Sequence, residues 1–450
     1  PLPSCCKSPD PGGYVRSKAF PANGLTRGSA IVFAVRLVNV AVAFGLSVLL
    51  LRALGLQEFG AYATYMAMMG LAVLPMTAGL PNLLVRAAAP AFADHKLDLV
   101  RGTLGFVLGI FWRYLLLLAL CLGVMWLVAP AWLSLPLLGL LWLHAQLQTL
   151  AALRSALLRA AGHVVRGQIL ERLVQPVLTL CFNVGAIFAL GEDFSVFHAV
   201  LALLAAHAVV FVWGGLWVRR FAIGPGPQSP VDRARLWSEG LSMSGSGFLS
   251  SVMMHGLVLM ISAVASLEAT GLYRIAAAVA QPLTYFHEVL VQVVSPRLAQ
   301  HWQRSEHRAL RRILHMGVLC SVGLVALGFV LLALVGRPLL GWAYGSESLA
   351  AFPILILLAL SHAANASGGL TDDFLNMSGF AVLAFRTRLV LIPMAFALTL
   401  PAVLIWGPAG AACILVAYQA SLAFWLGLRS RRATGIDPTF LGAIVATKRG

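Results

Sequence analysis

Residues 29–53 read SAIVFAVRLVNVAVAFGLSVLLLRA, and this stretch decides the class of fold. Arg36 and Arg52 are its only charged residues. An α-helix needs about 20 predominantly apolar residues to cross the hydrocarbon layer, so the stretch predicts one transmembrane helix. Similar runs follow at residues 60–85, 103–128, 135–157, 168–190, 195–218, 241–265, 270–296, 313–336, 351–374, 383–406 and 409–428. The sequence therefore predicts an all-α polytopic membrane protein with about twelve transmembrane helices.

The composition favours the same class. Of the 450 residues, 60% are hydrophobic and 11% are charged, whereas an ordinary soluble domain has about 25% charged residues. A soluble fold could not cover its surface with so few charges, so the apolar excess must face lipid. In a soluble protein the net charge of +16 would suggest a nucleic acid partner. Membrane proteins instead collect basic residues in their cytoplasmic loops, and we expect no nucleic acid partner here.

The positions of the charges predict the orientation of the chain. If the N-terminus lies in the cytoplasm, 27 of the 32 lysines and arginines fall in the tails and in the connections on the cytoplasmic side. The opposite connections contain only two arginines and are otherwise acidic: Arg52, Arg337, Glu58, Glu192, Asp193, Glu268 and Glu347. Incorrect span boundaries would scramble this alternation. The pattern therefore predicts a multi-pass protein with both termini in the cytoplasm.

The longest break between spans divides the chain into two halves. It contains Gly224-Pro225-Gly226-Pro227, a sequence typical of a linker. The expected organisation is a cytoplasmic tail, a six-helix lobe, a cytoplasmic linker, a second six-helix lobe and a second tail, at residues 1–28, 29–218, 219–240, 241–428 and 429–450.

A short motif recurs after the first span of each half. LQEFGAY at residues 56–62 aligns with LEATGLY at residues 267–273, an offset of 211 residues that also takes Arg86 onto Arg297. Duplication of a six-helix unit is the favoured explanation of the match, and the frequency of glycine in short external turns is the alternative. A true duplication would relate the two halves by an axis along the membrane normal, with a cavity between them.

Three segments of the first half resemble one known family. RGSA at residues 27–30 enters the first span, LRALGLQEFGAY at 51–62 closes it, and GLPNLLVR at 79–86 ends the second span. Together they resemble the polysaccharide (O-antigen, Wzx-type) flippases. These belong to the superfamily that includes the multidrug and toxic-compound exporters (MATE) and the lipid II flippase. The resemblance returns weakly at residues 267–297.

The resemblance implies a MATE-like transporter with two six-helix lobes in the bacterial cytoplasmic (inner) membrane. The expected substrate is an undecaprenyl-pyrophosphate-linked oligosaccharide, which crosses to the outer leaflet for the synthesis of O-antigen, lipopolysaccharide or another surface polysaccharide. Membrane lipids, a polysaccharide polymerase and chain-length proteins are the other expected partners. No zinc-ligand spacing, phosphate-binding loop or nucleophile-elbow motif occurs in the sequence, so we expect neither an enzyme nor a cofactor.

Basic residues inside spans are the first candidates for a substrate site. An arginine keeps its charge and can bind two phosphate oxygens, which suits a pyrophosphate group. Arg36, Arg113 and Arg274 lie within spans, and Arg86 and Arg297 lie at matched inner ends. Snorkelling of the guanidinium to the interface is the alternative for the first three. For Arg86 and Arg297, the preference of basic residues for the cytoplasmic ends of spans is a sufficient explanation.

Acidic residues near or within spans are candidates for ion coupling. Glu288, beside His287, is the deepest of them, and Asp372 and Asp373 lie close to the inner end of the tenth span. Glu288 could titrate, or pair with an arginine. The two aspartates could bind a cation or sugar hydroxyls, or could neutralise Arg388 and its neighbour Arg386.

Two other functions stay open at this point. A cation-coupled multidrug exporter would favour acidic groups in the first lobe, where Glu171 is the one near a span interior. A membrane-embedded glycan polymerase or ligase would need a large external loop, and the longest external connection, residues 337–350, is short.

Overall fold

A computed structural model describes residues 22–128, 134–221 and 226–447, and the regular structure in these ranges is entirely helical. Ten helices are long and apolar enough to cross a membrane. The first of these contains two spans, and one further span is built from two shorter helices, which brings the described spans to twelve. The expected all-α fold with twelve spans in two lobes is confirmed.

The first helix, α1 (Ala22–Thr77), contains both of the first two spans. Gly55 separates them with φ 76° and ψ 172°, a left-handed conformation that costs glycine little because it has no Cβ. The chain therefore reverses direction without a loop. A second break at Gly79 separates α1 from α2 (Leu80–Ala93), which completes the second span.

The rest of the first lobe contains the third to sixth spans of the chain. A π-helical turn interrupts the fifth span. Its elements are α3 (Leu97–Val128), α4 (Leu135–Ala160), α5 (Val164–Ile169), the π-helix η1 (Leu170–Val174), α6 (Gln175–Leu190), the 3₁₀-helix η2 (Gly191–Asp193) and α7 (Val196–Phe221).

The second lobe has six further spans and one short helix after them. Its elements are α8 (Arg233–Val264), α9 (Leu267–Ala280), α10 (Pro282–Gln303), α11 (His307–Tyr344), the 3₁₀-helix η3 (Ser346–Ala351), α12 (Phe352–Ser367), α13 (Thr371–Met377), α14 (Ala381–Trp406), α15 (Pro408–Thr434) and α16 (Phe440–Thr447). Several helices are longer than the apolar runs, because their polar first turns continue beyond the hydrocarbon layer.

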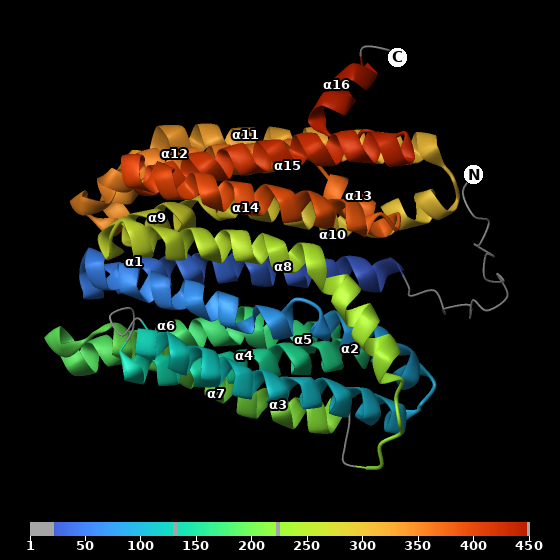
Figure 1. The fold of residues 1–450 in the computed structure, drawn as a ribbon, viewed down its shortest axis with the longest axis horizontal. Helices are drawn as coiled ribbons and strands as arrows, with labels where there is room; N and C mark the ends of the chain where they lie inside the picture. Colours follow the sequence, from blue (N-terminus) through green and yellow to red (C-terminus); the bar gives the residue numbers. More distant parts are fainter. Residues whose placement is uncertain (1–21, 129–133, 222–225, 448–450) are drawn as a thin grey trace.

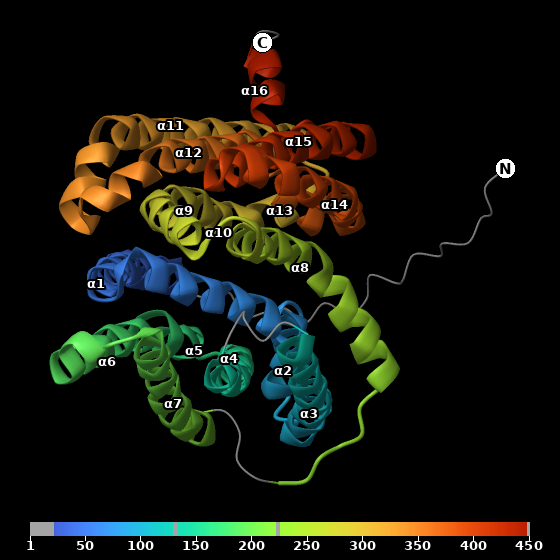
Figure 2. The same ribbon diagram turned by 60° about the vertical axis from the view of Figure 1, so that its left-hand side comes forward.

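The spans run along the long axis of the molecule, and α1, α8 and α9 lie between the two lobes (Figure 1). We call the end at which α1 begins and α15 ends the near end, and the end with the Gly55 turn the far end. Most of the helices of the two lobes lie on either side of this central layer (Figure 2). The short α16 leaves the near end sideways, across the direction of the spans (Figures 1 and 2).

Large apolar side chains cover the outside of the bundle. Phe188 is 88% exposed, Trp342 77% and Leu116 76%. Water would make such a surface unstable, whereas hydrocarbon solvates it. The buried core that includes Tyr65, Leu257 and Tyr273 continues across both lobes. The lobes are therefore held together by apolar packing at their centre, and the outer surface is suited to lipid.

Candidate functional site

The two lobes meet most closely at the far end, where two glycines allow backbone contact between α1 and α9. A Cβ atom added at Gly60 would lie 1.8 Å from the carbonyl oxygen of Leu267. One added at Gly271 would lie 2.7 Å from the carbonyl oxygen of Leu56. Contacts this short do not occur between real atoms, so neither position accepts a side chain in this state. We call the contact formed by Leu56, Gly60, Leu267 and Gly271 the seal.

The seal is reciprocal, because the offset of 211 residues takes Leu56 onto Leu267 and Gly60 onto Gly271. The preceding turns also correspond. Gly55 reverses the first half with φ 76° and ψ 172°, whereas its counterpart Ser266 has φ −161° and ψ 167° and accepts a hydrogen bond from the backbone N–H of Ala269, so the position of the turn corresponds and its φ does not. A reciprocal contact of this kind is what two copies of one unit form about a two-fold axis.

A second contact near the seal joins α1 to the end of α11. The Arg52 guanidinium donates hydrogen bonds from Nε to the carbonyl of Ala343 and from Nη2 to that of Trp342, each 2.9 Å long. The last carbonyls of a helix have no partner within it, and Arg52 supplies one from the other lobe. The hydroxyl groups of Ser47 and Tyr344 lie 2.6 Å apart. Together with the seal, these bonds close the far end.

Among the predicted site residues, Arg274 lies closest to the seal. It follows the first residue of α9 by seven positions, about 10 Å along the helix, which is deeper than the sequence indicated. Its side chain is exposed, and its charge lies within electrostatic reach of Tyr62, Tyr344 and His255. These residues belong to both lobes, so Arg274 places a positive charge at the interface, one turn inside the seal.

The other four predicted arginines are distributed differently. Arg86 is exposed on α2. Arg113 is also exposed, and lines a cavity of about 530 Å³ between α3 and residues 228–233 of the linker and α8. The side chains of Arg36 and Arg297 lie outside the part of the chain that the structure describes, although their helices are described.

The acidic candidates have several environments. Asp372 binds the Arg388 guanidinium through both carboxylate oxygens, at 2.8 and 3.1 Å, so the aspartate neutralises that arginine. Asp373 adjoins Asp372 in the first turn of α13 and is partly buried. Glu288 is partly buried on α10, and Nδ1 of the adjacent His287 lies 3.0 Å from the Ser321 hydroxyl. Within the described ranges no three His, Cys, Asp or Glu side chains gather as a metal site.

The first lobe contains a buried ion pair that was not predicted from the sequence. Nη2 of Arg154, on α4, donates to the Glu171 carboxylate at 3.0 Å, and Nη1 donates to the carbonyl of Val210 at 2.8 Å. Gly214 leaves the space that the guanidinium occupies, since a Cβ there would lie 2.3 Å from it. The pair joins the fourth span to the fifth, as Asp372 and Arg388 join the tenth to the eleventh.

The π-helical turn that carries Glu171 also contacts α1. A π-helical turn leaves one backbone carbonyl without its usual helical donor. The Asn39 side chain, on α1, donates to the carbonyl of Arg172 at 2.6 Å. The π-helical turn therefore joins the buried pair, through this hydrogen bond, to α1 at the lobe interface.

Twelve spans in two lobes, joined by a reciprocal contact, define a MATE-like membrane protein, and the comparisons with known proteins agree. The model of the polysaccharide biosynthesis protein family matches residues 25–302. The chain belongs to this family. No curated protein sequence matches it significantly.

Solved structures share the fold at low sequence identity. An inward-facing multidrug resistance MATE family transporter of the MOP superfamily matches with a TM-score of 0.70 and 13% identity, over 88% of this chain and 93% of that one. The lipid II flippase MurJ, in an inward closed conformation, matches with 0.64 and 12%, over 90% and 87%. A variant of the Vibrio cholerae MATE transporter VcmN matches with 0.60 and 13%, over 95% and 99%.

Proposed function

We propose that the protein is a flippase. It moves undecaprenyl-pyrophosphate-linked oligosaccharide repeat units across the bacterial cytoplasmic membrane by alternating access, for the synthesis of a surface polysaccharide such as O-antigen. The observation that carries the proposal is the reciprocal seal at Gly60 and Gly271, which brings the backbones of the two lobes into contact at the far end. Membership of the polysaccharide biosynthesis protein family supplies the substrate class.

The proposed orientation places the near end in the cytoplasm, with lobes at residues 29–218 and 241–428 and the linker at 219–240. It follows from the basic residues of the near-end connections and tails. In this orientation the seal lies on the outer side of the membrane, opposite the side on which the lipid-linked unit is made. A polysaccharide polymerase and chain-length proteins would take up the product outside.

The charges at the interface favour an anionic substrate. Arg274 lies at the interface, one turn inside the seal. The acidic residue of the first lobe that an exporter of organic cations would need, Glu171, is bound by Arg154. We assign pyrophosphate binding to Arg274 first, with Arg36, Arg86 and Arg297 as further contacts along the path and Arg113 as a contact in the cavity beside the linker. Glu288 and Asp373 are the proposed coupling residues.

Deleting the gene is expected to remove the surface polysaccharide and to leave lipid-linked repeat units in the inner leaflet. Glycan on the cell surface is measured by gel electrophoresis, and the lipid-linked units by extraction and mass spectrometry. A wild-type copy on a plasmid restores export. Normal surface polysaccharide in the deletion strain, with no intermediate, would contradict the proposal.

Arg274→Glu is expected to reduce export about tenfold or more, because the change replaces attraction of a pyrophosphate by repulsion. Arg337→Glu is the matched control, since Arg337 is exposed near the far end of α11 and precedes Trp342 and Ala343, which contact Arg52 of the first lobe. Export is measured in the complemented deletion strain, with the amount of each protein in the membrane determined by immunoblot. Equal export by the two variants would remove Arg274 from the site.

A further inference from the structure

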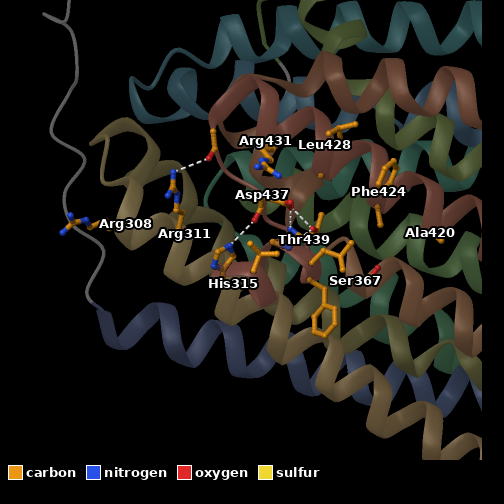
Figure 3. A pocket seen from close by; sticks show the side chains of 17 residues that line it. Arg308, Arg311, His315, Ser367, Ala420, Phe424, Leu428, Arg431, Asp437 and Thr439 are labelled. Carbon is orange, nitrogen blue, oxygen red and sulfur yellow. Dashed lines mark hydrogen bonds between the residues drawn. The ribbon is translucent and has the colours of Figure 1, made fainter. Parts of the chain in front are cut away.

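A large cavity lies outside the lobe interface, at the near end of the second lobe. Its volume is about 1290 Å³, and its walls come from α11, α15, α16 and the connection before α16 (Figure 3). It therefore belongs to the second lobe alone.

One side of the cavity is basic. Arg308 and Arg311 come from the first turns of α11, and Arg431 comes from the end of α15 (Figure 3). All three side chains are exposed. Nη2 of Arg311 donates a hydrogen bond to the carbonyl of Gly435 at 3.3 Å. An arginine has five N–H donors, so most of this capacity stays available for a ligand.

The one carboxylate in the cavity is already engaged. Asp437 Oδ1 accepts hydrogen bonds from the backbone N–H of Thr439 at 3.1 Å and from its hydroxyl at 2.7 Å. This interaction orders the start of α16. Nε2 of His315 lies 3.1 Å from the carbonyl of Asp437. The three guanidinium groups therefore outnumber the local negative charge, and the cavity is complementary to an anion.

The other side of the cavity is apolar. Phe424 is 58% exposed and precedes Arg431 by seven residues on α15, about 10 Å further toward the middle of the membrane. Leu441 and Val445 of α16 are 65% and 51% exposed and line the same cavity. They are four residues apart and share one helix face. The axis of α16 runs across the spans (Figure 1), which is the orientation of a helix that lies along a membrane surface.

We propose that this cavity binds one anionic phospholipid of the surrounding leaflet. Arg311 and Arg431 bind the phosphate, Arg308 contributes charge at the rim, and Phe424, Leu441 and Val445 contact the acyl chains. A basic group next to an apolar wall at the level of the interface matches the two parts of a phospholipid. The site is separate from the proposed transport path and holds α16 on the membrane.

The test measures lipid retention by the purified full-length protein. Native mass spectrometry is performed after equilibration with an equimolar mixture of phosphatidylglycerol and phosphatidylcholine. Wild type is expected to retain phosphatidylglycerol preferentially, and Arg311→Gln with Arg431→Gln to lower this preference about tenfold or more. The matched control is Arg312→Gln with Arg432→Gln. These arginines follow the tested ones by one position, about 100° around each helix, and do not line the cavity.

Each outcome decides the proposal. Preference in wild type and in the control, with loss in the Arg311 and Arg431 variant, supports it. Arg311→Lys with Arg431→Lys should keep part of the preference, which separates loss of charge from loss of folding. Equal retention of the two lipids by wild type, or equal loss in the variant and its control, would overturn it. A second protein chain in the spectrum that is displaced by neither lipid would assign the cavity to a protein contact instead.

Discussion

Gly60→Val is expected to abolish transport by preventing closure of the far end. Already the first carbon of the new side chain would lie 1.8 Å from the Leu267 carbonyl oxygen, so α1 and α9 must separate. Overpacking of a tight contact costs about 1–3 kcal/mol, which changes a population about five- to 150-fold. The protein would then stay open at the far end and fail to receive substrate from the cytoplasm.

Accessibility of a buried residue below the seal measures this effect. Thr64 is 3% exposed, and its hydroxyl donates to Ser262 across the lobe interface at 2.9 Å. In a protein whose native cysteines are replaced, Thr64→Cys should resist a membrane-impermeant maleimide added from outside. Addition of Gly60→Val should make it reactive.

A graded series provides the control. Gly271→Ala should have a smaller effect than Gly60→Ala, because its Cβ would lie 2.7 Å rather than 1.8 Å from the opposing carbonyl oxygen. Gly45→Ala, on the same helix as Gly60, should be neutral, because no atom lies within 4 Å of the added carbon. Normal transport by Gly60→Val, with Thr64→Cys still protected, would show that the seal has no role in transport.

Arg154→Leu is expected to be the most destabilising single substitution in the first lobe. The Arg154 side chain is 7% exposed and the Glu171 side chain 27%, so the change leaves a carboxylate in a poorly hydrated position. Removing one partner of a buried pair costs about 3–5 kcal/mol. The free energy of unfolding is measured in mixed detergent micelles.

The double variant distinguishes a buried charge from loss of packing. Arg154→Leu with Glu171→Leu should recover most of the lost stability, because replacing a whole buried pair with apolar residues is often neutral. Arg172→Leu is the matched control, since Arg172 is exposed beside Glu171. Equal destabilisation by Arg154→Leu and Arg172→Leu, or a double variant less stable than either single one, would contradict this account.

Much of the fold could be predicted from the sequence, because the thickness of the membrane sets the length of each apolar run. Each of the twelve candidate spans coincides with described helices over most of its length, although breaks at residues 78–79, 281 and 368–370 interrupt three of them. The boundaries were less accurate where a helix continues beyond the hydrocarbon, as α11 does at both ends of residues 313–336. The absence of a loop at Gly55 depends on one backbone conformation, which an apolar run does not indicate.

The site was less predictable, because a helix that is apolar all round does not show which face meets the other lobe. Arg113 and Arg274 therefore looked alike in the sequence, although one lines a cavity beneath the linker and the other lies at the lobe interface. The Arg52 contact with the end of α11 joins distant segments and has no local signal.

The buried pairs did have a signal in the sequence. Arg154 and Glu171 lie at similar distances before and after the turn at residues 161–163, and Asp372 and Arg388 do so around residues 378–380. Opposite charges on either side of a short turn between antiparallel spans lie at the same depth. That rule predicts both pairs. It also gives Arg154 a structural role in addition to its contribution to the bias of basic residues toward the cytoplasmic side.

The most direct test of the central claim is translocation by the purified protein in vesicles. A polyprenyl-pyrophosphate-linked oligosaccharide with a labelled sugar is placed in proteoliposomes, and its exposure to an added glycan-degrading enzyme is followed over time. Wild-type protein should move the labelled lipid from one leaflet to the other, whereas protein-free vesicles and the Gly60→Val protein should not. Movement in wild-type vesicles no faster than in protein-free ones would contradict the account.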